Sequence, residues 1–504
     1  MQMNLGINPL LLVTFFPLLG VLVLAFIPGE RKAAIRWTAM ATSLATFAIS
    51  LWLLAQFDLT KSGLQLGVDQ PWVNLGGIEI RLQMGVDGLS LLMVLLTTFL
   101  TPIAILSTWT SVTERVKGFM IFFLLMETGM LGVFLALDLV LFYVFWEFTL
   151  VPMYFLIGMW GHERRIYAAI KFILFTMAGS ILMLLAILYM GLQARTFSYE
   201  ALLTNRMVFV GVSQWLFLAF GLAFAIKVPI FPLHTWLPDA HVEAPTAGSV
   251  ILAGVLLKMG CYGFLRFNLP LFPEASVRFA PLMAVLAVIG IIYGAAVAFA
   301  QKDLKKLVAY SSVSHLGFVM LGIFALTAQS VSGSILQMVN HGLSTGALFL
   351  IVGMLYDRRH TRELSAFGGL WKVVPVMAAL SLVVSLSSMG LPGLNGFVGE
   401  FTILAGSFLP TSALASPWYA GVATLGVILA AVYLLVMFEK VFLGPVTVTE
   451  NLKMLELNWR EIVILAAILV VIFWIGLYPK FFFDLMNPTV ENLVKVVRSA
   501  AGLP

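Results

Sequence analysis

Acidic and basic side chains stand inside long apolar segments of this 504-residue chain. They are Glu147, Lys227, Lys258, His315, His341 and Glu400. A charge inside a bilayer costs roughly 2.5–3.5 kcal/mol on insertion scales, so its presence calls for a function. Carboxylates, amines and imidazoles take up and release protons, and rows of them in membrane helices are typical of proton relays. The residue types therefore predict a path for protons.

Glu147 and Lys227 are the first pair expected along this path. Glu147 stands between bulky apolar residues, and Lys227 precedes Pro229 and Pro232. Burial disfavours the charged carboxylate, whereas a nearby lysine favours it, so a Glu–Lys pair exchanges protons as its separation changes. The alternative is a static salt bridge that clamps two helices. The prolines beside Lys227 favour motion over a clamp.

Lys258 has no acidic residue near it in the sequence. An isolated buried lysine gives up its proton readily, which suits a central proton carrier. The alternative is that its ammonium group reaches an interface with water along its flexible side chain. Its position in the middle of an apolar segment disfavours that alternative.

Two histidines and Glu400 complete the expected path. His315 and His341 can relay protons near neutral pH, although a lone buried histidine is often only a hydrogen-bonded core residue. Neither has the cysteine or histidine spacing of a metal site. Glu400 follows the break Gly390-Leu-Pro-Gly393, where water could reach it, and we expect it to be the proton exit.

Other titratable groups are less strongly indicated as proton carriers. Glu127, Asp138 and Lys171 lie nearer the ends of their segments, which favours solvated or structural roles, and Asp138 in particular is expected to be structural. The loop 234–241 contains two histidines and an aspartate at a helix break. It could admit protons or satisfy freed backbone groups, and the sequence leaves both open.

Composition places the whole chain in a membrane. Hydrophobic residues make up 61% of it and charged residues 11%, against about a quarter charged in soluble domains. The single cysteine, Cys261, excludes a cysteine-ligated iron–sulfur cluster in this chain. We find no GxGxxG, Walker A or CxxCH motif, so a nucleotide site or haem is not expected. A nucleic-acid partner is not indicated either, because the net charge of +5 follows from membrane topology.

The apolar segments predict an all-α polytopic protein with about fourteen transmembrane helices. The expected spans are 8–27, 35–55, 86–107, 118–136, 139–158, 167–190, 211–231, 245–266, 280–300, 307–327, 333–355, 374–408, 417–439 and 460–479. The first segment is expected to be a retained helix, since positive charges follow it and do not precede it. The 374–408 segment is too long for one straight crossing and reads as one interrupted helix.

An internal repeat is expected within one transmembrane domain covering 1–504. Helices 4–8 (about 118–266) and 9–13 (about 280–439) form two sets of five, and an odd number inverts the second set. The fourth member of each set, helix 7 and helix 12, contains prolines and is expected to be discontinuous. Interrupted segments at matching positions point to an ion pathway, although prolines are also ordinary in membrane helices.

Basic residues predict the orientation, because they favour cytoplasmic loops. One set of alternate loops carries most of them: Arg31, Lys32, Arg36, Arg115, Lys117, Arg164, Arg165, Lys302, Lys305, Lys306, Arg358, Arg359, Arg362, Lys372, Lys440, Lys453 and Arg460. The opposite set carries Lys61, Arg81, Arg195, Arg206, Arg266, Arg278, Lys480, Lys495 and Arg498. Both termini are therefore expected on the non-cytoplasmic side, with a bacterial plasma membrane as the expected location.

Long motifs resemble the antiporter-like membrane subunits of complex I, the NADH–quinone oxidoreductase. They are FWEFTLVPMYF at 145–155, KVPIFPLHTWLPDAH at 227–241, APTAGSV at 244–250, LKKLVAYSSVSHLGF at 304–318 and LQMVNHG at 336–342. The resemblance extends from the third helix to the fourteenth. Within the family, FVGEF at 397–401 is similar to the chain M branch, since related branches usually have a lysine near this break.

The resemblance implies fourteen helices, the inverted repeat and one proton moved per cycle. It also implies a Glu147–Lys227 pair, Lys258 as central carrier, His315 as link and Glu400 as terminal group. The expected partners are the lipid bilayer and other membrane subunits, including related antiporter-like chains, while FMN, iron–sulfur clusters and quinone belong to partner subunits. Subunits of multisubunit cation/proton antiporters or membrane-bound hydrogenases are the alternative, and a passive membrane anchor is another.

Overall fold

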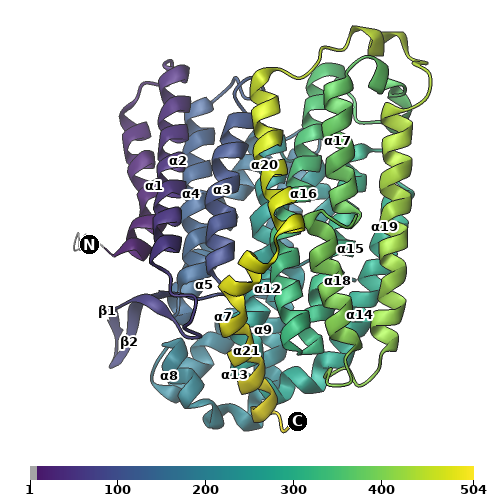
Figure 1. The fold of residues 1–504 in the computed structure, drawn as a ribbon. Helices are drawn as coiled ribbons and strands as arrows, with labels where there is room; N and C mark the ends of the chain where they lie inside the picture. The colour runs from purple at the N-terminus through teal and green to yellow at the C-terminus, as the bar shows by residue number, and fades with distance from the viewer. Residues whose placement is uncertain (1–7, 504) are drawn as a thin grey trace.

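Long apolar helices run side by side across the molecule in the computed structural model, which describes residues 8–503 (Figure 1). The helices are α1 (Pro9–Phe26), α2 (Lys32–Gln56), α3 (Leu91–Ser107), α4 (Val116–Leu135), α5 (Leu139–Phe148), α6 (Leu150–Trp160), α7 (Arg165–Ala194), α8 (Tyr199–Thr204), α9 (Ser213–Lys227), α10 (Trp236–Glu243), α11 (Thr246–Ile251), α12 (Leu257–Gly263), α13 (Leu269–Leu271), α14 (Pro273–Phe299), α15 (Leu304–Ala325), α16 (Ala328–Arg359), α17 (Pro375–Ser388), α18 (Asn395–Phe408), α19 (Trp418–Phe442), α20 (Trp459–Leu477) and α21 (Lys480–Ala500).

Within the described residues, 12 helices are long and apolar enough to cross a membrane, and α3 and α17 are shorter apolar helices. The prediction of a mostly helical, multi-pass membrane protein is therefore confirmed. The count of about fourteen crossings and the inverted repeats stay predictions. The side of the membrane on which each chain end lies also stays a prediction. Residues 1–7 and 504 lie outside the described residues.

Burial divides the bundle into a centre and a periphery. The helix 246–271, formed by α11 to α13, and α16 are 100% buried over their apolar windows, whereas α1, α7, α19 and α20 are 39% buried. A helix that is apolar all round and fully enclosed belongs to the core of a large protein. The central helices therefore carry the polar residues that lipid would not tolerate.

The predicted breaks in helices 7 and 12 are confirmed. Helix 7 consists of α9, which ends at Lys227, and α10, which begins at Trp236. The Trp236 indole donates to the carbonyl of Ile226 at 2.9 Å, which satisfies one backbone group freed by the break. Helix 12 consists of α17 and α18, and Gly390 and Gly393 between them adopt positive φ, which glycine does without steric cost.

The helix 246–271 departs from the prediction, which ended it near 266. Two π-helical turns interrupt it, at Leu252–Leu256 and Phe264–Asn268. Such turns often occur at functional sites. Arg266, which we expected in a loop, lies inside the second turn with an exposed fraction of 4%. The loop assignment of Arg266 is therefore wrong, because the helix continues to Leu271.

A β-hairpin interrupts the helical pattern and was not predicted. Strands β1 (Gln65–Leu75) and β2 (Ile78–Val86) pair antiparallel, with Asn74 opposite Glu79. Gly76 and Gly77 form the turn with positive φ, as two-residue hairpin turns require. The hairpin lies at the same end of the bundle as α8, α13 and α21 (Figure 1). The fold is therefore helical with one small sheet.

Candidate functional site

Lys258 lies at the centre of the bundle with no exposed surface. Its Nζ lies 2.7 Å from Nδ1 of His341 on α16, and it also donates to the carbonyl of Ala253 in the first π-helical turn. The disfavoured alternative, in which Lys258 reaches an interface with water, does not hold in this structure. The ammonium group instead contacts an imidazole, which can accept its proton.

His315 and Glu400 form a second buried contact. His315 Nδ1 lies 2.7 Å from Glu400 Oε1, and both side chains are 3% exposed. Gln337 donates to the same carboxylate oxygen at 2.9 Å, and the Tyr433 hydroxyl lies 3.1 Å from His315 Nε2. The imidazole therefore has a polar neighbour at each nitrogen, the arrangement that proton transfer through a ring requires.

The two histidines connect these contacts. The ring centroids of His315 and His341 are 6.0 Å apart, and both rings line a cavity of about 10 Å³. That volume is close to what one water needs. Lys258, His341, His315 and Glu400 thus form a row through the membrane core, with one gap that a single water could bridge.

Further polar side chains lie around the break in helix 12. Asn340 donates to the backbone carbonyl of Asn395 at 2.7 Å, and Ser387 donates to the side-chain carbonyl of Asn395 at 2.5 Å. Ser344 lies 2.6 Å from Ser387. These bonds tie α16 to both halves of the broken helix, so the break is held by side chains of the same helix that carries His341.

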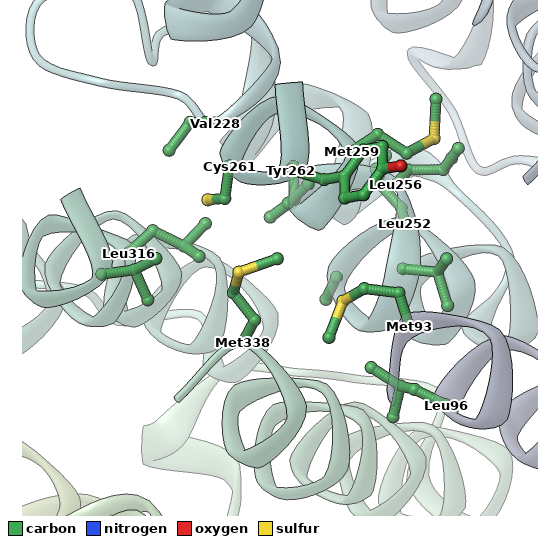
Figure 2. Close-up of a cluster of buried hydrophobic side chains, with 14 of the residues drawn as sticks. Met93, Leu96, Val228, Leu252, Leu256, Met259, Cys261, Tyr262, Leu316 and Met338 are labelled. Atoms are coloured by element: carbon green, nitrogen blue, oxygen red, sulfur yellow. The ribbon is translucent and has the colours of Figure 1, made fainter. Parts of the chain in front are cut away.

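Buried apolar side chains form a cluster on the helices that carry the row and on neighbouring segments. They come from α3, the helix 246–271, α15, α16 and the segment after Lys227, and include Met93, Leu96, Val228, Leu252, Leu256, Met259, Cys261, Tyr262, Leu316 and Met338 (Figure 2). Such surroundings exclude bulk water and strengthen every electrostatic interaction inside them.

Glu147 and Lys227 do not form an ion pair, although the resemblance implied one. Among the described residues, neither Lys227 Nζ nor Glu147 Oε1 has a hydrogen-bond partner. Lys227 is 1% exposed, and its ammonium lies 5.5 Å from the ring centroids of Trp146 and Phe172. Lys227 and Glu147 still interact electrostatically. The structure therefore holds the two groups apart, with aromatic faces around the ammonium.

Three residues given weaker roles are placed as follows. Asp138 caps α5 by accepting from the amides of Val140 and Leu141, which agrees with a structural role. Lys171 donates to Asp239 at 2.6 Å, and both side chains are partly exposed. Glu127 is fully buried, and neither of its carboxylate oxygens has a partner among the described residues. Glu127 was expected near a solvated end, so that expectation is wrong.

Arg266 forms a buried ion pair that the sequence did not indicate. Its Nη2 lies 2.6 Å from Oδ1 of Asp87, and its Nε donates to the Tyr262 hydroxyl at 2.9 Å. Tyr262 in turn donates to the carbonyl of Phe134 at 2.8 Å. The guanidinium thus ties the helix 246–271 to α4 and to the start of α3.

The described residues include no cluster of His, Cys, Asp or Glu side chains that could hold a metal ion. The row itself brings titratable nitrogen and oxygen atoms into contact, and such atoms can exchange protons.

Comparison with known proteins places this arrangement in a family. Residues 136–426 match the family described as "NADH:quinone oxidoreductase/Mrp antiporter, TM". The chain is 46% identical to NADH-quinone oxidoreductase subunit M of Rhodobacter capsulatus, covering 98% of each chain. It is 45% identical to NADH-ubiquinone oxidoreductase chain 4 of Marchantia polymorpha, covering 95% of each.

Two solved structures also match this chain over most of its length. A chain of respiratory complex I from Thermus thermophilus with bound NADH matches with a TM-score of 0.85 and 34% identity, over 97% of this chain and 99% of that one. A chain of an archaeal membrane-bound sulfane sulfur reductase matches with a TM-score of 0.81 at 24% identity, over 93% of this chain and 76% of that one, which indicates a shared fold.

Proposed function

The chain belongs to the transmembrane family of NADH:quinone oxidoreductase and Mrp antiporter subunits, and from this premise we propose that it moves protons as the antiporter-like subunit M of a complex I. Relatives covering almost the whole chain are named as subunits of NADH–quinone and NADH–ubiquinone oxidoreductases, which favours this enzyme over a cation/proton antiporter. The chain contributes to the enzyme as a proton translocase and carries out no redox chemistry itself.

The observation that carries the proposal is the buried row from Lys258 to Glu400. Its members come from the helix 246–271, α15, α16 and α18, and each is at most 3% exposed. Burying four titratable side chains in a membrane core is costly unless they function. A passive anchor gains nothing from that cost.

Proton transfer follows the contacts in order. The Lys258 ammonium gives a proton to Nδ1 of His341, at 2.7 Å. His341 passes a proton through a water to His315, and His315 passes one from Nδ1 to Glu400 Oε1, at 2.7 Å. Glu400 releases it at the break in helix 12. One proton crosses per cycle.

Glu147 and Lys227 control the charge on Lys258 in this proposal. Lys227 has no hydrogen-bond partner among the described residues and stands beside the break in helix 7, so it is free to move toward or away from Glu147. When the two are apart, as here, the Lys227 ammonium lacks a counter-charge and donates its proton toward the row. When they meet, the pair is neutral overall and the row takes up a new proton.

The wider setting of the chain is part of the same proposal. Residues 1–504 form one transmembrane domain with helices 4–8 and 9–13 as inverted repeats, and both termini face away from the cytoplasm. The neighbours are other membrane subunits of the complex, including related antiporter-like chains. FMN, iron–sulfur clusters and quinone reside in partner subunits. The membrane is a bacterial plasma membrane, as the bacterial relatives suggest.

Sealed membrane vesicles containing the intact complex test the proposal. Proton uptake driven by NADH is compared for wild type, Glu147→Gln and Glu400→Gln, with NADH oxidation and complex assembly followed in parallel. We expect both variants to assemble normally and to lose proton uptake per complex. Normal uptake per assembled complex in both variants would show that the buried charges are structural.

A further inference from the structure

A polar cavity opens at the basic end of the bundle, above the buried row. Its volume is about 640 Å³, and it is lined by His162, Glu243, Asp303 and Arg362 among others. Burial, and then the charges of Lys305 and Arg362, lower the pKa of His162 to about 4. The cavity thus holds acidic and basic groups together, and Glu243, which is 8% exposed, lies in its wall.

Lys305 is buried and interacts electrostatically with His162 in the wall of this cavity. Its Nζ donates to the carbonyl of Ala244 at 2.5 Å and to that of Val242 at 3.5 Å, and the side chain is 3% exposed. It also interacts electrostatically with Glu243. A cation at the C-terminal end of α10 is stabilised by the helix dipole, which accounts for its position. A lysine has three donor hydrogens, so one remains for a further neighbour.

His241 is the next titratable group toward the row. It has no exposed surface, and its ring stacks on Phe349 with centroids 4.6 Å apart. Neither ring nitrogen has a hydrogen-bond partner among the described residues. His241 interacts electrostatically with both Lys305 and Lys258. A buried imidazole with two unpaired nitrogens between two lysines is unexplained by packing, because phenylalanine would stack equally well and leave no polar atom unpaired.

Helix α16 connects His241 to the row. His341, Thr345 and Phe349 are spaced four residues apart and share one face of this helix. The Thr345 hydroxyl is buried without a partner among the described residues and lies one turn from His341 toward His241. His341 also interacts electrostatically with His241. A hydroxyl can accept and donate at once, so it can carry a proton between the two rings.

We propose that Glu243, Lys305 and His241 form the entry branch by which protons pass from the basic face to Lys258 and His341. The inference rests on the proposed function, since it supplies the row with protons. It also decides between the two roles that the sequence left open for the loop 234–241. His241 admits protons, whereas His234 lies against Phe231 and Tyr293 and packs the break.

Two substitutions at His241 separate proton transfer from packing. His241→Phe keeps the stack on Phe349 and removes the titratable group. His241→Glu loses the stack and keeps a group that exchanges protons. His234→Phe is the matched control, because it replaces a second buried histidine of the same loop with the same residue. Each variant is assayed in sealed vesicles for NADH-driven proton uptake per assembled complex, together with Lys258→Met.

We expect His241→Phe to lower proton uptake by about a hundredfold, the lower end of what a positioned proton-transfer group contributes. His241→Glu should retain a measurable part of that uptake, and His234→Phe should remain near wild type. Normal uptake by His241→Phe, or equal loss in both His241 variants with assembly intact, would overturn the entry branch. If Lys258→Met pumps normally as well, the proposed function fails, whereas its loss with normal His241→Phe confines the failure to this branch.

Discussion

Lys258 and Arg266 are buried cations of one helix, eight residues apart, and they differ in what surrounds them. Both lie beside or inside a π-helical turn. Arg266 contacts the Asp87 carboxylate at 2.6 Å and the Tyr262 hydroxyl at 2.9 Å. Lys258 contacts only the imidazole of His341 and a backbone carbonyl among the described residues. One cation is neutralised by a fixed counter-charge, and the other is not.

The chemistry of the two side chains matches this difference. A guanidinium keeps its proton under all physiological conditions and binds carboxylates in a rigid geometry, so the Arg266–Asp87 pair suits a structural joint. An ammonium on a flexible chain loses its proton readily when buried without an acid. Burial of a charge in a membrane protein is therefore not sufficient to mark a proton carrier. The absence of a counter-charge and the presence of an exchangeable neighbour are the distinguishing features.

The largest effect is expected from breaking the structural joint. Asp87→Asn leaves the Arg266 guanidinium buried without its counter-charge, which should destabilise the fold by about 3–5 kcal/mol. We expect much less assembled complex and a lower midpoint temperature for thermal unfolding of the purified complex. Asp69→Asn is the matched control, because it removes a carboxylate from Arg81 in a surface pair. Equal assembly of the two variants would contradict the structural role of Arg266.

Lys258→Met should give the opposite pattern. The change removes a buried charge and keeps a long apolar side chain, so assembly should be near wild type while proton uptake falls about a hundredfold or more. Lys258→Arg sharpens the comparison, because it restores a cation that cannot release its proton. We expect it to pump no better than Lys258→Met. Recovery of uptake with arginine would mean that charge alone, and not exchange, is required at this position.

A smaller effect is expected at the far end of the row. Tyr433→Phe removes the hydroxyl that lies 3.1 Å from His315 Nε2 and leaves the contact of Nδ1 with Glu400. The loss of one buried hydrogen bond is worth about 1 kcal/mol, or roughly a fivefold change. Proton uptake per complex should fall by about that factor, with NADH oxidation measured alongside. A loss as large as that of Lys258→Met would place Tyr433 in the row itself.

The sequence predicted the members of the row but not their contacts. Lys258 and Glu400 stand out because charges in apolar segments are costly. Their partners His341 and His315 lie 83 and 85 residues away, so only the folded chain brings them together. The direct Glu147–Lys227 pair was implied by resemblance, and their separation here depends on the aromatic packing around Lys227, which no local pattern encodes.

Two further features show where local patterns failed and where a usable signal was present. Arg266 was assigned to a loop because the expected span ended at 266, yet the π-helical turn carries the helix past it to Leu271. The β-hairpin had a readable signal in Gly76-Gly77 between alternating residues.

The smallest effect is expected at a lysine that resembles Lys258 in sequence and differs from it in the fold. Lys171 also lies in an apolar helix, but it pairs with Asp239 at 2.6 Å, where the two side chains are 21% and 31% exposed. Pairs of this kind contribute about 0–1 kcal/mol, since water screens them. Lys171→Ala should therefore leave assembly unchanged and proton uptake within about twofold of wild type. Lys258→Ala in the same vesicles should reduce proton uptake far more, because no water-exposed group can take over proton transfer at the buried position of Lys258. Equal losses in the two alanine variants would mean that burial and the lack of an acidic partner do not distinguish proton carriers from structural lysines in this chain. The assignment of Lys258 as the central carrier would then be wrong.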